Sequence, residues 1–254
     1  MYRPARPYLA AALSVSAVAL SIVAAHPSGA ADRASGDDSV QQLYTACHGL
    51  AAGLAGLTVS DANPGRTPCK TDLQAIPHKI VPLLLGSLDV ATIAGQTVAN
   101  QTPGLEQAAG SIAATHLSLL GLDIKATDIT SYVYARANNC SSVTTSGLSH
   151  IGRLTINGKT FLAGDQPLTI TLPLGLGAIY VNQQVKSGNT IVRRALFLDL
   201  PGTFLDVVVA QSSAGVSCTA PVTIASTVKR YHEPSKAQVR SVKARLEKLG
   251  GRTF

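Results

Sequence analysis

The sequence contains no tryptophan, and aromatic residues make up only 4% of its 254 positions. Sheets that bind sugars or single-stranded nucleic acids commonly present aromatic platforms on which rings and bases stack. Tyr132 and Tyr134 have the spacing to share one face of a strand and to form a small platform. Ordinary cross-strand packing is the alternative role for this pair.

Motifs that carry chemistry are also scarce. The part of the chain before the C-terminal tail has a single glutamate, Glu106. Hydrolysis by paired carboxylates needs an acid and a base held close together in a cleft, but Asp123 and Asp128 are five apart on an expected strand and so should point to opposite faces. Ser149 and His150 are adjacent, but no G-x-S-x-G elbow frames the serine, and we interpret GLSHIG as a turn. The sequence predicts no enzyme.

The sequence also contains no motif typical of a cofactor-binding site. No Gly-rich phosphate loop, dinucleotide fingerprint or calcium loop is present. His116 has no partner at metal-ligand spacing, and the four cysteines show no C-x-x-C pair, which argues against the alternative of a zinc site. We therefore expect no cofactor and no metal.

The net charge of +7 is distributed unevenly. Residues 32–228 are almost neutral, whereas the tail from Lys229 carries eight Lys and Arg residues against two glutamates. Affinity for phosphate backbones needs basic groups clustered on the folded face, so the sequence does not predict nucleic-acid binding.

The N-terminus has the pattern of an export signal. Arg3 and Arg6 precede an almost wholly apolar run from Tyr8 to Ala25, and small residues follow at Ser28-Gly29-Ala30. We predict a signal peptide over residues 1–31 and a polar leader over 32–41; an uncleaved membrane anchor is the alternative. The expected localisation is secreted or extracellular, including association with the cell surface.

The cysteine count fits an exported protein. Cys47, Cys69, Cys140 and Cys218 all follow the signal, and an even number of cysteines in an exported chain indicates disulfides. Four cysteines permit three pairings. We favour Cys47–Cys69 and Cys140–Cys218 because each pair brackets what looks like one structural unit.

Hairpin signals dominate residues 42–228. RLTI and KTFL flank Asn157-Gly158, the pair that best tolerates a type I′ turn, and Thr190–Leu200 should pair with Thr203–Gln211 across Pro201-Gly202. These patterns predict an all-β domain, a layered antiparallel sheet or β-sandwich. A β-solenoid is the alternative, since LDVATI and LDIKATDI resemble each other about 34 residues apart.

Several segments carry a family resemblance. The segments LYTACHGLAAGL, HLSLLGLDIKATDI, NNCSSVTTSGLSHIGRLTINGKTF, PLTITLPLGLGAIYVNQQV and ALFLDLPGTFLDVVVAQSSAGVSC are similar to those of the actinobacterial surface proteins called choice-of-anchor P, over about residues 42–219. The resemblance implies an extracellular β-rich body of unknown molecular function whose attachment signal varies between members. An LPxTG-like sorting motif is not present here.

The sequence of the tail, residues 229–254, predicts a short amphipathic helix. Pro234-Ser235 and Gln238 fit a helix start, and an apolar stripe is formed by Val239, Val242, Leu246 and Leu249. The candidate attachment residues on its basic surface are Lys236, Arg240, Lys243, Arg245 and Lys248. This surface suits an anionic wall polymer or membrane surface; a helix docked on its own domain is the alternative.

These observations lead to one functional expectation. We expect a non-enzymatic cell-envelope or extracellular protein, structural or adhesive, that its basic tail retains. A secreted hydrolase and a β-domain that binds a small molecule or glycan are the alternatives.

Overall fold

The computed structural model describes residues 44–54, 57–83, 86–100, 105–119, 121–139, 142–172, 177–200, 205–218, 222 and 224. All of them belong to one compact unit, Val40–Phe254. The described residues form strands and no helix. The strands are β1 (Tyr44–Leu54), β2 (Leu57–Ala62), β3 (Asp72–Leu83), β4 (Gly86–Asn100), β5 (Leu105–Leu119), β6 (Leu122–Asn139), β7 (Ser142–Ile156), β8 (Lys159–Phe161), β9 (Leu168–Leu172), β10 (Gly177–Ser187), β11 (Thr190–Leu200) and β12 (Leu205–Ser217).

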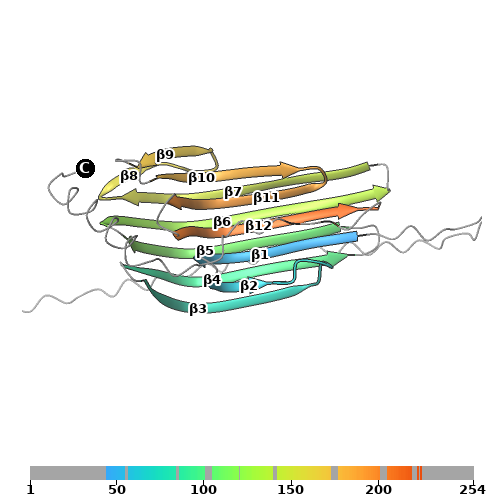
Figure 1. Ribbon diagram of the computed structural model, residues 1–254, viewed down its shortest axis with the longest axis horizontal. Coiled ribbons are helices and arrows are strands. Elements are labelled where there is room, and N and C mark those ends of the chain that lie inside the picture. Colours follow the sequence, from blue (N-terminus) through green and yellow to red (C-terminus); the bar gives the residue numbers. More distant parts are fainter. Residues whose placement is uncertain are drawn as a thin grey trace, which may run out of the picture. The chain divides into compact units, whose positions relative to one another are not determined.

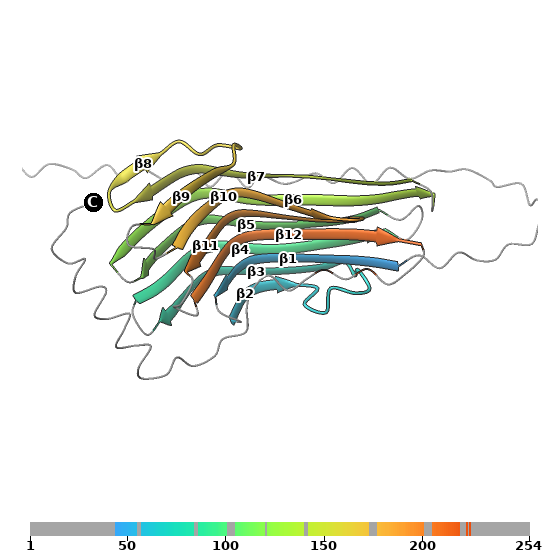
Figure 2. The ribbon, with the colours of Figure 1, turned by 45° about the horizontal axis from the view of Figure 1, so that its top comes forward.

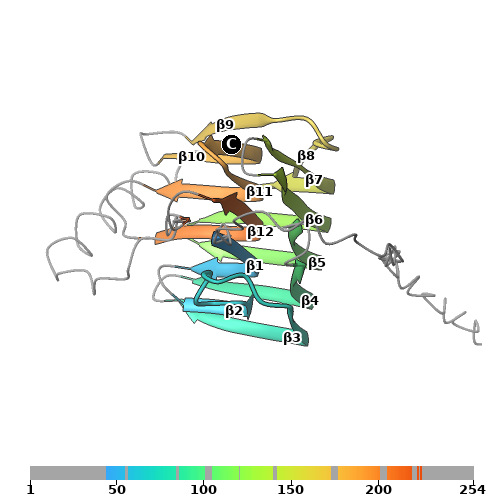
Figure 3. The same cartoon turned by 90° about the vertical axis from the view of Figure 1, so that its right-hand side faces the viewer.

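The strands form two antiparallel sheets of six strands that pack face to face (Figures 1 and 3). Sheet A has the order β2-β1-β12-β11-β10-β9, and sheet B has the order β3-β4-β5-β6-β7-β8. The chain enters sheet B at one edge, crosses it strand by strand, and returns to sheet A at the other edge. β12 then pairs with β1, so the first and last described strands lie side by side in the middle of sheet A.

This arrangement confirms the prediction of an all-β layered antiparallel fold, and the solenoid alternative is wrong. The Asn157-Gly158 hairpin is present: both residues have positive φ angles, 48° and 79°, and Ile156 pairs with Lys159. β11 and β12 pair as expected, with Arg194 opposite Gln211. The predicted signal peptide, polar leader and C-terminal helix lie outside the described residues.

Two local interpretations were wrong. GLSHIG is not a turn but the middle of β7, and Ser149 is buried there while His150 lies on the opposite side of the strand. Asp123 and Asp128 both lie on the outer face of sheet B, because the alternation of buried and exposed residues shifts by one position at Thr127-Asp128.

That shift recurs at the same level of neighbouring strands. Asp128 in β6 and Thr92 in β4 have φ angles of 53° and 48°, and the cross-strand pairs on either side of them keep their register. Ser60 and Ala210 occupy the corresponding level of sheet A, also with positive φ. A residue in the left-handed region turns the strand about its axis, so the inward side passes from even to odd positions in β4 and β6. Figure 2 shows the strands of both sheets curving along their length.

The larger apolar core extends across this level, with members on both sides of Thr92 and Asp128. A row of isoleucines runs across sheet B with each member opposite the next: Ile76, Ile93, Ile112, Ile129 and Ile151. Four of them are at most 2% exposed. Leucines and valines from both sheets complete this core, and burial of such side chains is the main stabilising contribution to a sandwich.

A row of glycine and serine residues brings the two sheets into backbone contact. In sheet B, Gly95, Gly110, Ser131 and Ser149 are successive cross-strand partners. The facing row in sheet A contains Gly49 and Ser212, which are also partners. We call these six residues the glycine–serine row.

The contact across this row is direct. A Cβ atom on Gly49 would lie 2.5 Å from the carbonyl oxygens of Gln96 and Ala109, and one on Gly110 would lie 2.5 Å from that of Leu50. Hydroxyls join the sheets beside these glycines: the Ser131 and Ser212 Oγ atoms are 2.5 Å apart. In β2, Ser60 Oγ donates to the Gln74 carbonyl oxygen and accepts from the Gly95 amide.

We expect Gly110→Ala to lower the free energy of unfolding by about 1–3 kcal/mol, because its methyl group would overlap backbone atoms that cannot rotate away. Gly65→Ala is the matched control, since a Cβ there has no atom within 4 Å, and its effect should stay within about 0.5 kcal/mol. Denaturant unfolding with the disulfides intact measures both variants. Equal losses in the two variants would show that the sheets are not in backbone contact.

Candidate functional site

The predicted disulfide between Cys47 and Cys69 is confirmed, with a Cα–Cα distance of 4.9 Å. Cys218 is also disulfide-bonded, and its predicted partner Cys140 lies outside the described residues. The five basic residues predicted for surface attachment, Lys236, Arg240, Lys243, Arg245 and Lys248, lie outside them too. The site that the structure describes is therefore built around Cys47 and Cys69.

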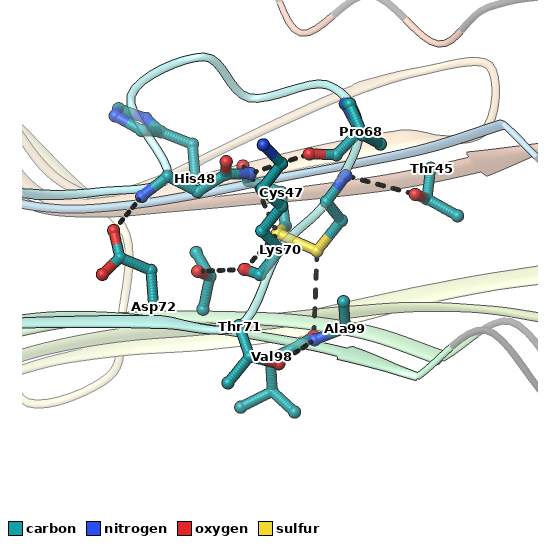
Figure 4. The surroundings of a disulfide bond; sticks show 12 residues. Thr45, Cys47, His48, Pro68, Lys70, Thr71, Asp72, Val98 and Ala99 are labelled. Carbon is teal, nitrogen blue, oxygen red and sulfur yellow. Dashed lines mark hydrogen bonds between the residues drawn. A yellow bond between two sulfur atoms is a disulfide. The ribbon is translucent and has the colours of Figure 1, made fainter.

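The disulfide joins β1 to the loop that follows β2 (Figure 4). The loop begins with a turn at Asn63-Pro64-Gly65, closed by a hydrogen bond from the Arg66 amide to the Asn63 carbonyl oxygen. Asn63 has a φ angle of 53°, a conformation that asparagine tolerates better than most residues. Its side-chain amide donates to the Cys47 carbonyl oxygen at 2.8 Å.

Further hydrogen bonds fix both sides of the loop without involving the sulfur atoms. The Cys69 amide donates to the Thr45 carbonyl oxygen, and the Cys47 amide donates to that of Arg66. On the side of sheet B, Thr97 Oγ1 donates to the Lys70 carbonyl oxygen at 2.7 Å. The loop is thus held between β1 and β4 by its backbone.

Glu106 lies in the interior next to this disulfide. One of its carboxylate oxygens and the Sγ atoms of Cys47 and Cys69 all lie within 4.8 Å of one another. The residue is 0% exposed, and neither carboxylate oxygen has a hydrogen-bond partner among the residues that the structure describes. Burial without a partner disfavours the charged form and raises the pKa of the Glu106 carboxyl to about 8.

The register of sheet B places Glu106 there. Glu106 is opposite Ala99 of β4 and Ala135 of β6, and it shares the inward side of β5 with Ala108 and Gly110. The smaller apolar core around it is made of Cys47, Cys69, Ala108, Val133, Ala135, Ala137, Ile191, Ala214 and Val216. In the sequence, Glu106 was notable only as the single glutamate before the C-terminal tail. The sequence does contain one indication that Glu106 is buried: it lies at every-second-residue spacing from Ala108, Gly110 and Ile112, so on a strand it shares their face.

This group is not a metal centre in the oxidised protein. Cys47, Cys69 and Glu106 form the one cluster of three or more possible ligands in the described part of the chain. The two sulfur atoms are bonded to each other, however, and a thiolate is the form of cysteine that binds metal.

The described histidines are all engaged with aspartates instead of converging on a site. The pairs are His48–Asp61 at 2.5 Å, His78–Asp89 at 2.7 Å, His116–Asp123 at 2.5 Å and His150–Asp165 at 2.5 Å. The last three have exposed side chains and lie on the side of sheet B. Ser149 is buried on the other side of β7 from His150, so the two do not form a nucleophile–base pair.

Tyr132 and Tyr134 do lie on one face, as predicted. Both are half-buried on the outer face of sheet B, where Tyr132 is opposite Leu148, whose side chain is 55% exposed. Burial, with a smaller contribution from Tyr134, raises the pKa of Tyr132. The pair therefore presents apolar ring surface beside an exposed leucine.

The outer face of sheet A differs from that of sheet B. Arg194 of β11 is buried there; its Nε donates to Gln211 Oε1 at 3.0 Å and its Nη1 to Gln183 Oε1 at 2.6 Å. Its guanidinium also lies 4.7 Å from the centre of the Phe197 ring. Val222 and Ile224, which follow β12, pack against Ala46 and Val192 on this face.

Comparisons of the chain with protein-family models, with curated proteins and with solved structures find no match. Within the described residues there is also no helix with the length and apolar character needed to cross a bilayer.

We expect Glu106→Gln to change the pH dependence of stability. The folded-state pKa of about 8 exceeds the ordinary value of 4.5, so between these pH values the folded protein keeps a proton that the unfolded chain has lost. Wild-type stability should therefore fall as the pH rises through this interval, at up to about 1 kcal/mol per pH unit, and level off above pH 8.

Glutamine cannot ionise, so the stability of Glu106→Gln should not fall in this way as the pH rises. The variant should match the wild type near pH 4 and be the more stable protein at pH 8. Denaturant midpoints across this range, with the disulfides intact, measure the difference. Asp128→Asn, a change at an exposed carboxyl group of β6, is the matched control and should follow the wild-type curve. Parallel curves for wild type and Glu106→Gln would contradict the assignment.

Proposed function

We propose that this protein is a non-enzymatic exported protein of the cell envelope or extracellular space, with a structural or adhesive role. The observation that carries the proposal is the outer face of sheet B. Five of its strands, β3 to β7, have 12 to 18 residues each, and their outward side chains form a broad accessible surface.

The chemistry of that surface supports recognition more than catalysis. Exposed hydroxyls line β7, at Ser142, Thr144 and Ser146, and the histidines and aspartates of this face are joined in hydrogen-bonded pairs. Such a surface offers many hydrogen-bonding groups to a partner. Large interaction surfaces depend on shape and hydrogen bonding of this kind.

The disulfides support export. Cys47–Cys69 closes a loop, and Cys218 is bonded as well, a usage typical of oxidising compartments. The resemblance to choice-of-anchor P surface proteins and the signal-like N-terminus favour the same location. Retention at the envelope is then the proposed task of the basic tail beyond Lys229.

A glycan- or small-molecule-binding domain is the second candidate. The half-buried rings of Tyr132 and Tyr134 beside exposed Leu148 favour it, because ring faces of this kind stack on apolar faces of ligands.

Truncation before Lys229 should release the protein from the envelope fraction into the medium. Replacing Lys236, Arg240, Lys243, Arg245 and Lys248 by glutamine should do the same, because it removes the charge that anionic polymers attract. Retention of the full chain should weaken as salt rises. Fractionation with quantitative blotting measures each case.

A matched variant separates attachment from docking on the domain itself. Polar replacement of Val239, Val242, Leu246 and Leu249 keeps the basic charge and removes the apolar stripe. If this variant loses stability while the glutamine variant stays in the envelope fraction, the tail is part of the fold and is not the anchor.

The surface itself is tested with Tyr132→Ala/Tyr134→Ala. We expect this double variant to lower binding to purified envelope material or glycan at least tenfold, because stacking surface is lost, while the unfolding midpoint changes little. The control is Tyr180→Ala, which removes a ring stacked on Phe197 of sheet A. Equal binding by all three proteins would remove the tyrosine pair from the recognition surface.

A further inference from the structure

A buried acid beside a disulfide is the feature that the proposed function does not use. Glu106 has no partner for either oxygen within the described part of the chain, and it lies within 4.8 Å of both sulfur atoms. Buried polar groups are almost always hydrogen-bonded, so an unpaired carboxyl group needs a specific reason. Proton exchange with the neighbouring cysteines is such a reason.

The disulfide lies directly beneath the surface. Cys47 is 0% and Cys69 is 3% exposed, but Pro68 and Lys70 on either side of Cys69 are exposed. A local opening of this loop would therefore uncover the Cys69 sulfur before that of Cys47. A nearby cation also favours the approach of an anionic thiolate, and Lys70 lies on the accessible side.

The arrangement does not depend on the sulfur–sulfur bond. The backbone bonds from Cys47 to Arg66 and from Cys69 to Thr45 hold the two cysteines together, and the Asn63 side chain bridges Cys47 to the Pro68 carbonyl oxygen. Reduced cysteines would thus remain adjacent to each other and to Glu106, ready to form the bond again.

We propose that Cys47, Cys69 and Glu106 form a thiol–disulfide exchange site for small dithiols, in which Glu106 exchanges the proton of Cys47. In reduction, one thiolate of the dithiol attacks Cys69 Sγ. The bond between the cysteines breaks, a mixed disulfide forms on Cys69, and the electron pair goes to Cys47 Sγ, which takes the proton of the Glu106 carboxyl group.

The second thiolate of the dithiol then attacks its own sulfur in the mixed disulfide. Cys69 leaves and is protonated from solvent, and Glu106 regains its proton from solvent. The dithiol is oxidised to its cyclic disulfide, and the two protein sulfurs end as thiols, so two electrons and two protons have moved. In the reverse direction the Glu106 carboxylate accepts the proton of the Cys47 thiol.

Few other charges act on this acid. Arg193 of β11 extends into the interior near Gly147, Lys70 is on the loop, and His48 of β1 is engaged with Asp61. Exposed Arg136 is the charged residue at this end of β6. Burial is the cause of the raised pKa of Glu106, so none of these cations holds the carboxyl group ionised, and it stays a proton donor at neutral pH.

The test is the rate of reduction by dithiothreitol between pH 6 and 9.5, expressed per concentration of dithiothreitol thiolate. Alkylation followed by peptide mapping reports Cys47 and Cys69 separately from Cys218. For the wild type we expect a constant rate below about pH 8 and a fall approaching tenfold per pH unit above it, as the donor proton is lost. Glu106→Gln should be at least tenfold slower at pH 7 and should show no such fall.

If Glu106 has only a structural role, the reduction rate per thiolate should change with pH in the opposite direction. If ionised Glu106 only weakens the fold, the wild-type rate per thiolate rises with pH and Glu106→Gln removes the rise; that result overturns the proposal, as do identical profiles. Glu106→Asp, which keeps the acid on a shorter side chain, should restore the fall above pH 8 at an intermediate rate. Reduction at Cys218 in the same samples is the internal control and should be unaffected by the changes at Glu106.

Discussion

The backbone contact between the two sheets at the glycine–serine row constrains the rest of the structure. Where Gly49 faces Gln96 and Ala109, no side chain fits between the layers, so the two sheets are fixed in distance and in register. Hydroxyl bridges such as Ser131–Ser212 replace the apolar packing that usually joins sheets. The row therefore divides the interior into two unequal cores.

The two cores have different physical characters. The larger one contains the isoleucine row and many leucines, and it can stabilise its half of the sandwich by apolar burial alone. The smaller one has nine buried residues, four of which are alanines that bury less surface each. A disulfide between β1 and the loop after β2 is placed in that weaker half, where a covalent link offsets the smaller apolar contribution. Glu106 is buried in the same half, where its carboxyl group, which has no hydrogen-bond partner in the described part of the chain, opposes stability.

The polar residues on the outer face of sheet B differ from the buried acid beside the disulfide in how they are partnered. On the outer face of sheet B, histidines and aspartates satisfy each other in exposed pairs, and the surface between them is accessible to a partner. In the interior, the Glu106 carboxyl group lies next to two sulfur atoms and has no hydrogen-bond partner among the described residues. The exposed pairs suit recognition, whereas the buried acid suits proton exchange, so the two proposals concern different parts of the molecule and stand independently.

The sequence by itself determined the fold class and the hairpins at Asn157-Gly158 and between β11 and β12. It left three disulfide pairings open, among which the structure contains Cys47–Cys69. The fold class and the hairpins follow from local rules: turn residues tolerate positive φ, and alternation identifies strands. Only the tertiary structure decided the site. The shift of the inward side at Asp128 and Thr92 breaks simple alternation, so the faces of Asp123, Asp128 and GLSHIG could not be assigned from spacing. Glu106 meets the disulfide because β1 and β5, far apart in the chain, belong to sheets that touch, and no local pattern encodes that contact.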